Sequence, residues 1–342
     1  MKVGIYFDLR NPPEWRQSWS RLYGFTLEMC EEAERLGCDS IWSTEHHLFD
    51  DGYVTQPLTF LAAVAARTKQ VRLGTGIVIA PLHHPVEIAE QAAMVDIISG
   101  GRLDLGLGAG YRVPEFDLFG ADISRRYTTT DSTAREVRRL LAGVAGGSAG
   151  SGGSGGGLTP PAVQDPLPIW MGYQGPKGAR RAGLLGAGLL SANGALWAPY
   201  RAALIEAGHD PSMGRMAGGL QGFVTEDPEA DWPTVSKHLA YQVDSYRRHM
   251  VEGTDTPTPR PVDPERMRAN DINAPVLAAF TYGTPEEVAA TVLRRTAGAP
   301  VETVFVWASL GGSSEEMTAR HVQTICSRLR PLLAAGPPSS AP

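Results

Sequence analysis

Short apolar runs alternate with amphipathic segments along most of this chain. A β-rich run over residues 2–7 is followed by an apolar stripe at helical spacing over residues 22–36, which ends at Gly37. The alternation then repeats. We expect further strands near residues 40–43, 71–80, 101–110, 167–171, 188–192, 217–225 and 303–307. Further helices are expected near 57–67, 86–98, 130–142, 177–185, 232–252, 285–297 and 314–333, and another follows the strand at 188–192 and ends at Glu206. Eight strand–helix units predict an α/β fold, a single-domain (β/α)8 TIM-type barrel with insertions.

The segment 71–115 shows the pattern most clearly. Its first run, VRLGTGIVIA, stops at Pro81, and a helical segment leads to the break at Gly100 and the second run, GRLDLGLGAG. Strand, helix and strand in this order predict a βαβ unit with parallel strands. The glycines lie at strand ends, where parallel α/β proteins bind ligands. An open doubly wound sheet is the alternative, but the first strand is not followed by the GxGxxG that a dinucleotide-binding half requires.

Three segments interrupt or end this regular pattern. Residues 146–157 contain only Gly, Ser and Ala and predict a flexible segment, which is a replaced loop, a natural low-complexity insertion or a domain boundary. Residues 253–275 are rich in Pro, Thr, Asp and Arg without periodicity, which is typical of a lid or of disorder. We expect the barrel to span residues 1–334 and residues 335–342 to form a disordered tail.

Composition narrows the function classes. The chain has 342 residues, 42% of them hydrophobic and 20% charged, with a net charge of −6 and no long basic run. It can bury a large core, and we expect neither nucleic acid nor a membrane as partner. Three cysteines without a CxxC pair indicate reduced thiols. The N-terminus becomes polar at Asp8, too early for a signal peptide, so we expect a cytoplasmic protein.

The candidate chemistry begins with Glu45, His46 and His47 at the end of the second strand. Histidine exchanges a proton near neutral pH, and residues at this face of a barrel are typically catalytic. The simpler interpretation is a pair of loop histidines hydrogen-bonded for structure. A metal site built with His83 and His84 is disfavoured, because adjacent side chains on an extended segment point apart and no HExxH is present. We therefore expect no metal.

Two glycine-rich loops are candidates for binding a ligand. Gly108, Ala109 and Gly110, followed by Tyr111, end the fourth strand, where glycine lets a backbone approach a phosphate or a ring. A tight βα turn would explain them equally. The second loop enters a helix N-terminus, which favours anions, and contains Gly172, Tyr173, Gln174, Gly175 and Gly178. Among the aromatic residues, most belong to the core by expectation, and Trp307 is the candidate wall of a substrate pocket.

Several motifs occur in an order that resembles one known family. They are EHH at 45–47, GTGIV at 74–78, HPVEIAEQ at 84–91, SGGRLDLGLGAG at 99–110, EFDLFG at 115–120 and GTPEEV at 283–288. This series resembles the bacterial luciferase-like flavin monooxygenases over nearly the whole chain. The resemblance implies a barrel that takes reduced FMN from a separate reductase, forms a flavin C4a-(hydro)peroxide with O2 and oxygenates a small organic substrate. It implies that His46 is the acid/base.

The resemblance also implies further site residues. Relatives carry a non-prolyl cis peptide under the flavin ring, which corresponds to the bond between Gly76 and Ile77. An arginine that faces the cofactor phosphate corresponds to Arg126. Glu115 corresponds to an acidic residue near the ring, although a solvated helix-end glutamate is an equal alternative. The chain departs from luciferase itself at Gly108 and Ala109, where luciferases have a reactive cysteine and a phosphate-binding arginine.

The family resemblance leaves alternatives open. The same fold also carries deazaflavin-dependent enzymes that transfer hydride without oxygen, and some relatives are non-catalytic flavin-binding subunits of heterodimers. Relatives pair through the helices after the second and third strands, here 58–66 and 86–98, so we expect a homodimer. Alanines on these helices would allow close approach, namely Ala62, Ala63, Ala66, Ala89, Ala92 and Ala93.

Overall fold

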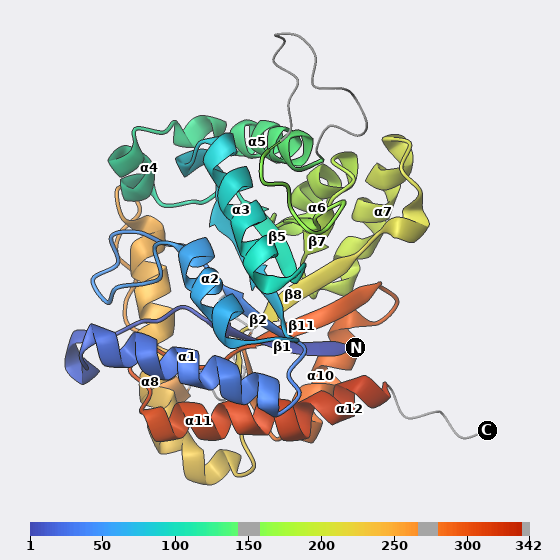
Figure 1. Ribbon diagram of the computed structural model, residues 1–342. Helices are drawn as coiled ribbons and strands as arrows, with labels where there is room; N and C mark the ends of the chain where they lie inside the picture. The colour runs from blue at the N-terminus through green and yellow to red at the C-terminus, as the bar shows by residue number, and fades with distance from the viewer. Residues whose placement is uncertain (143–157, 266–279, 337–342) are drawn as a thin grey trace, which may run out of the picture.

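The computed structural model describes residues 1–142, 158–265 and 280–336, and its parallel strands close into a barrel (Figure 1). The third of eight positions is shared by β3 and β4, which both pair with β5. Pairing of β1 with both β2 and β11 continues the ring. The predicted (β/α)8 barrel is therefore confirmed. Its strands are β1 (Lys2–Phe7), β2 (Ser40–Ser43), β3 (Arg72–Thr75), β4 (Val78–Ile79), β5 (Leu103–Gly108), β6 (Ile169–Met171), β7 (Gly188–Leu190), β8 (Met216–Leu220) and β11 (Val301–Trp307).

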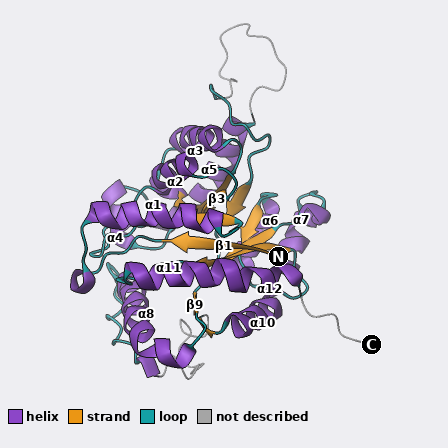
Figure 2. Ribbon diagram, turned by 60° about the horizontal axis from the view of Figure 1, so that its bottom comes forward, coloured by secondary structure: helices purple, strands orange, loops and turns teal. Residues whose placement is uncertain are grey.

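Helices surround the strands (Figure 2). Most lie within a few residues of the predicted segments, and the helix predicted at 57–67 is found with the same bounds. The longer ones are α1 (Trp19–Arg35), α2 (Pro57–Arg67), α3 (Pro85–Ser99), α5 (Arg126–Leu141), α6 (Gly175–Leu184), α7 (Trp197–Glu206), α8 (Pro228–Val251), α10 (Pro285–Thr296) and α11 (Glu315–Thr324). A π-helical turn at Ile325–Leu329 joins α11 to α12 (Arg330–Ala335). One short helix, α4 (Val113–Phe119), was not predicted.

Strand alternation divides the core into two layers. On β1, Val3, Ile5 and Phe7 pack in the outer layer against helices, whereas Tyr6 points into the barrel. Inside, Trp42 stacks on Phe305 with ring centroids 4.4 Å apart. The interior is therefore filled with aromatic side chains. The expectation that most aromatic residues belong to the core is confirmed for Tyr6, Trp42 and Trp307 inside the barrel and for Phe7 in the outer layer.

The seventh predicted strand differs from the structure, and the predicted lid is only partly among the described residues. The seventh predicted strand is two strands, because the chain leaves the barrel after β8 and β9 (Gly222–Val224) pairs with β10 (Thr281–Gly283). The described part of the predicted lid, 253–265, returns along α8, where the Val262 N–H donates to Asp244 at 2.9 Å. Residues 146–157, 266–275 and 337–342 of the predicted linker, lid and tail lie outside the described residues. No helix in the described ranges is long and apolar enough to cross a membrane.

Candidate active site

The loop after β2 carries the candidate catalytic residues at the carboxyl end of the barrel. The His46 N–H donates to the Val54 carbonyl at 2.9 Å, and the Val54 N–H donates to the Asp8 carbonyl at 3.0 Å. The loop is thereby tied to the segment after β1. Its adjacent histidines join different partners, which agrees with the expectation that such side chains point apart.

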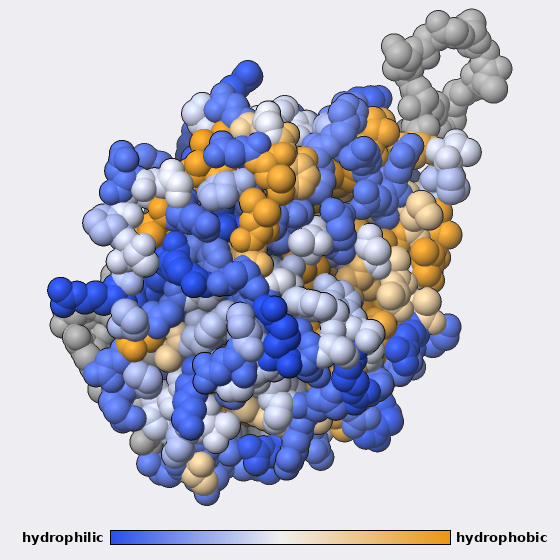
Figure 3. All heavy atoms as spheres, turned by 90° about the vertical axis from the view of Figure 1, so that its left-hand side faces the viewer, coloured by the Kyte–Doolittle hydropathy of each residue, from blue (hydrophilic) through white to orange (hydrophobic). Residues whose placement is uncertain are grey.

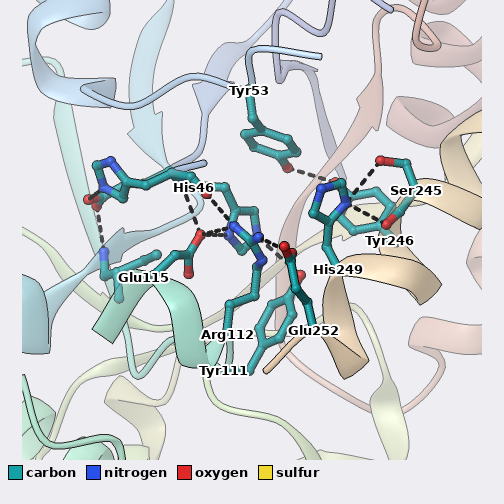
Figure 4. A network of polar contacts seen from close by, with 12 residues as sticks. His46, Tyr53, Tyr111, Arg112, Glu115, Ser245, Tyr246, His249 and Glu252 are labelled. Atoms are coloured by element: carbon teal, nitrogen blue, oxygen red, sulfur yellow. Dashed lines mark hydrogen bonds and ion pairs between the residues drawn. The ribbon is translucent and has the colours of Figure 1, made fainter. Parts of the chain in front are cut away.

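His46 is hydrogen-bonded to a buried carboxylate. Its Nδ1 lies 2.8 Å from Oε1 of Glu115, a residue of α4 that is fully buried rather than solvated (Figure 4). Burial opposes ionisation of Glu115, but the hydrogen bond and charge of His46, the His47 N–H and the Arg112 charge outweigh it and lower its pKa. An ionised carboxylate only accepts, so Nδ1 of His46 carries the proton and Nε2 is the nitrogen that faces Tyr111, 3.3 Å from its hydroxyl.

Aromatic rings enclose His46. Phe49, Tyr53 and Tyr111 have ring centroids within 4.8–5.2 Å of the imidazole. The Tyr53 hydroxyl lies 2.6 Å from the Tyr246 hydroxyl, and the Tyr246 ring is parallel to Trp307 at 6.3 Å. Burial raises the pKa of each of these three tyrosines. The surroundings are therefore apolar with neutral hydroxyls, and such an environment excludes water.

His47 belongs to a second cluster. Oε1 of Glu45 lies 2.8 Å from Nε2 of His47 and 2.6 Å from Nε2 of His83, while Oε2 accepts the Ile79 N–H at 2.7 Å. The three possible ligand atoms lie within 4.8 Å of one another, close enough for a metal ion. However, the carboxylate oxygen lies at hydrogen-bond distance from both imidazoles, where the ion would have to be inserted. We therefore describe the cluster as a hydrogen-bonded clamp.

A buried charge cluster lies on the other side of the tyrosines. Arg10 Nε donates to Asp51 at 2.8 Å, and its guanidinium lies 4.9 Å from the Tyr246 ring centroid. Asp8 accepts from Gln242 at 3.2 Å. Burial raises the pKa of Asp8 to about 7, although the Arg10 charge opposes the rise. Asp8 therefore titrates near neutral pH.

The two glycine loops meet at the predicted cis peptide. The bond between Gly76 and Ile77 is cis, as predicted. A Cβ added at Gly108 would lie 2.6 Å from the Ile77 side chain, and one at Gly172 would lie 2.4 Å from it. Only glycine therefore allows the β5 and β6 ends to close on Ile77. Ala109 is buried beside them, and Gly110 adopts a φ of 66° that glycine favours.

The predicted phosphate end is built by α5 and α6. Arg126 donates to the Ile123 carbonyl at 3.2 Å and lies 4.6 Å from the Tyr127 ring, while its buried Nε finds no partner among the described residues. Tyr173 is buried and donates to Asp131 at 2.6 Å, which fixes the loop before α6. Gln174 is exposed and does not cap α6, and Pro176 has no N–H. Among the described residues, the N–H groups of Gly175, Lys177 and Gly178 at the start of that helix have no observed side-chain cap. In the described chain, a Cβ at Gly175 would meet nothing within 4 Å.

This end fits a phosphate. An unpartnered buried guanidinium N–H and an uncapped helix N-terminus both favour an anion. Gly178 differs from Gly175, because a Cβ there would lie 2.6 Å from the Tyr173 side chain, so its role is packing of the loop.

Sequence reasoning missed several members of the site. Arg112 is buried between His47 and Glu115, and its NH2 donates to Glu252 at 2.6 Å. Phe49 lies beneath its guanidinium at 4.4 Å. An arginine three residues before a glutamate was the only local signal, since Glu252 is 140 residues away in the chain.

The comparisons with known proteins agree with the fold and the motif order. The family model for luciferase-like monooxygenases matches residues 1–302. The chain therefore belongs to the luciferase-like monooxygenase family.

Individual relatives match over different lengths. The oxygenase component of a flavin-dependent trigonelline monooxygenase from Acinetobacter baylyi is 45% identical over 95 residues, which cover 28% of this chain and only 26% of that protein. The crystal structure of monooxygenase RslO1 from Streptomyces bottropensis has a TM-score of 0.77 at 26% identity, covering 97% of this chain and 99% of that one. Two structures at 19% identity share the fold. One is the oxygenating constituent of 3,6-diketocamphane monooxygenase from Pseudomonas putida with FMN (TM-score 0.71), the other an F420-dependent secondary alcohol dehydrogenase (0.70), and each match covers 97% of this chain and 98% of that one.

Proposed function

We propose that this protein is the oxygenase component of a two-component flavin-dependent monooxygenase, which receives reduced FMN from a separate reductase and oxygenates a small organic substrate with O2. The observation that supports it best is the His46–Glu115 pair, buried among aromatic rings at the carboxyl ends of the strands. Family membership and the word "oxygenase component" in a relative's name support the same function.

The residues for holding FMN would come from both glycine loops. Arg126 and the N-terminus of α6 would bind the phosphate, and the cis Gly76–Ile77 segment with Gly108, Ala109, Gly110 and Tyr111 would lie beside the ring. When bound, reduced FMN supplies the electrons that activate O2. The Gly172–Gly175 loop would complete the phosphate side.

The chain's own residues supply proton control and water exclusion. Because Glu115 fixes the proton of His46 at Nδ1, Nε2 is left to take up or deliver a proton on the side of Tyr111. Phe49, Tyr53 and Tyr111 exclude water around that nitrogen. Trp307 and Tyr246 are the proposed wall of the substrate pocket.

The second candidate function is hydride transfer with a deazaflavin, which the shared fold of the F420-dependent dehydrogenase favours. The test is to titrate the purified protein with FMN and with a deazaflavin, each oxidised and reduced. Tighter binding of reduced FMN and oxygen-dependent product formation would support the monooxygenase. Anaerobic turnover with reduced deazaflavin would contradict the monooxygenase and support hydride transfer. Unchanged activity of an assembled enzyme carrying His46→Ala would instead indicate a non-catalytic subunit.

A homodimer is proposed with a corrected contact surface. The structure buries Ala89, Ala92 and Ala93 of α3 within the chain, so these alanines cannot contact a partner as the sequence suggested. Met94, Ile97 and Ile98 of the same helix are exposed instead. Of the predicted α2 alanines, Ala63 and Ala66 are exposed and Ala62 is half-buried, so that part of the predicted surface is retained. Figure 3 shows apolar residues gathered in the upper part of the face that it views. Exposed apolar surface of this kind is typical of an interface.

A further inference from the structure

Arg112 connects the proposed acid/base pair to the end of α8. Its guanidinium has 0% exposure, and NH1 donates to the His47 carbonyl and, at 3.2 Å, to Oε1 of Glu115. NH2 donates to Oε2 of Glu252 at 2.6 Å. Burying a guanidinium is costly unless it is paired and hydrogen-bonded, and here two carboxylates from different elements pair with it.

The two carboxylates have different roles in this network. Glu115 is buried, and the oxygen that accepts from Arg112 also accepts from Nδ1 of His46 at 2.8 Å. Arginine and imidazole therefore share the charge of one oxygen. Glu252 follows α8 directly and is 47% exposed at its side chain. Figure 4 shows Glu252 beside Arg112 in the network. Glu252 therefore competes with Glu115 for the charge of Arg112.

We propose that Arg112 is a positioning residue through which Glu252, at the end of α8, sets the proton affinity of His46. The consequence for catalysis rests on the proposed function, in which His46 is the acid/base, whereas the electrostatic link does not. When the Glu252 charge is lost, Glu115 becomes the carboxylate partner that remains to Arg112. Arg112 then neutralises more of the Glu115 charge, so Glu115 stabilises a protonated His46 less. Loss of Arg112 has the opposite effect. The two changes must therefore shift the pKa of His46 in opposite directions.

Other rings and charges near His46 are the same in all the variants compared. Tyr53 and Tyr111 contact its ring, and His249 stacks on Phe49 with centroids 3.9 Å apart. Beyond these rings are the charges of Arg10, Asp8 and Arg248. The loop residue Asp50, which pairs with Arg248 near the end of α8, provides a matched control. Asp50 is 53% exposed and accepts from Arg248 at 3.0 Å, without an observed bond to Arg112 among the described residues.

The experiment is an NMR titration of histidine-labelled protein without cofactor, with the His46 signal assigned by its loss in His46→Gln. Glu252→Gln should lower the pKa of His46 by about 0.3–1 unit, less than the 1–3 units of a direct contact. Arg112→Met should raise it by about 0.5–1 unit, and Arg112→Lys should restore it in part. Asp50→Asn removes the same charge and should change it by less than about 0.2 unit.

Shifts of equal sign, no shift, or an equal shift in Asp50→Asn would overturn the proposal. If Arg112→Met does not fold, the comparison of Glu252→Gln with Asp50→Asn decides alone. The pH profile of kcat with reduced FMN then distinguishes the electrostatic link between Glu252 and His46 from the acid/base role of His46. If the pKa of His46 moves as expected while the profile does not follow, the link is present and the acid/base role of His46 is wrong.

Discussion

The site divides into a proton-handling side and a phosphate side, and two substitutions should separate them. His46 and its Glu115 partner come from the β2 and β5 ends, whereas Arg126 belongs to α5 and has an unpartnered buried Nε among the described atoms. Replacing His46 with Ala should reduce turnover by about 10²–10⁴, the usual range for loss of a general acid/base. FMN affinity should change little, because no phosphate-binding group is removed.

Arg126→Ala should give the reverse result. Its guanidinium would contribute a charge-assisted hydrogen bond worth about 1.5–3 kcal/mol, so FMN affinity should fall about 10- to 150-fold. Turnover at saturating flavin should largely survive. Exposed residues of the same types provide controls: His84→Ala and Arg125→Ala should change neither quantity.

The assay is a flavin titration and a single-turnover rate for each variant. The reasoning is refuted if both variants lose affinity and rate together, because the two sides would then not be separable. A fully active His46→Ala would assign His46 a structural role. His47 or Glu115 would then be the next candidates for the acid/base.

Three further predictions concern stability and assembly. Because burial raises the pKa of Asp8 to about 7, the folded protein retains a proton that the unfolded chain loses above pH 4, so stability falls as pH rises from about 4 to 7. Between pH 5 and 8, the free energy of unfolding should fall by about 2 kcal/mol less in Asp8→Asn than in the parent protein, as measured by urea unfolding. An equal dependence on pH in the two proteins would contradict the prediction. Gly24 lies in α1 with open space where a Cβ would be, so Gly24→Ala should stabilise the protein by about 0.5–1 kcal/mol. A Cβ at Gly106 would lie 2.0 Å from a backbone oxygen, so Gly106→Ala should destabilise it. Thermal melts measure both effects. Light scattering should show a dimer that Met94→Glu with Ile97→Glu converts to a monomer; a monomeric parent protein would exclude the interface.

The fold was predictable because its elements repeat a local pattern. Apolar stripes, proline starts and glycine stops located α2 and α3 to within a residue or two. The short helix α4 was missed because seven residues are too few for a periodic signal. The division of the seventh strand was missed because β9 has the composition of a strand and leaves the barrel only to pair with β10. Pairing partners of that kind are set by tertiary structure.

The site was predictable where residues follow strand ends and unpredictable where they meet across the chain. His46 and Gly108 were chosen as candidates because the carboxyl ends of parallel strands share one face of a barrel. The cis bond before Ile77 was predicted from the family resemblance, and the structure has it. The state of Glu115 was left undecided, since burial of a helix-end carboxylate depends on what packs above it. Arg112 and Glu252 were not paired, because no pattern in one strand–helix unit indicates that α8 returns over another.

The adjacent histidines show how one sequence motif can serve two networks. Side chains of neighbouring residues in an extended segment point in opposite directions. His46 therefore faces Glu115 and the aromatic rings, whereas His47 faces Glu45 and His83. Glu115 fixes the backbone between them, because it accepts hydrogen bonds from both Nδ1 of the His46 ring and the His47 N–H. Burial would lower the pKa of His83, but its hydrogen bond to Glu45 and the charge of Glu45 outweigh this and raise it. The clamp formed by Glu45 thus fixes the loop on one side, while Glu115 and the aromatic rings surround the His46 ring on the other.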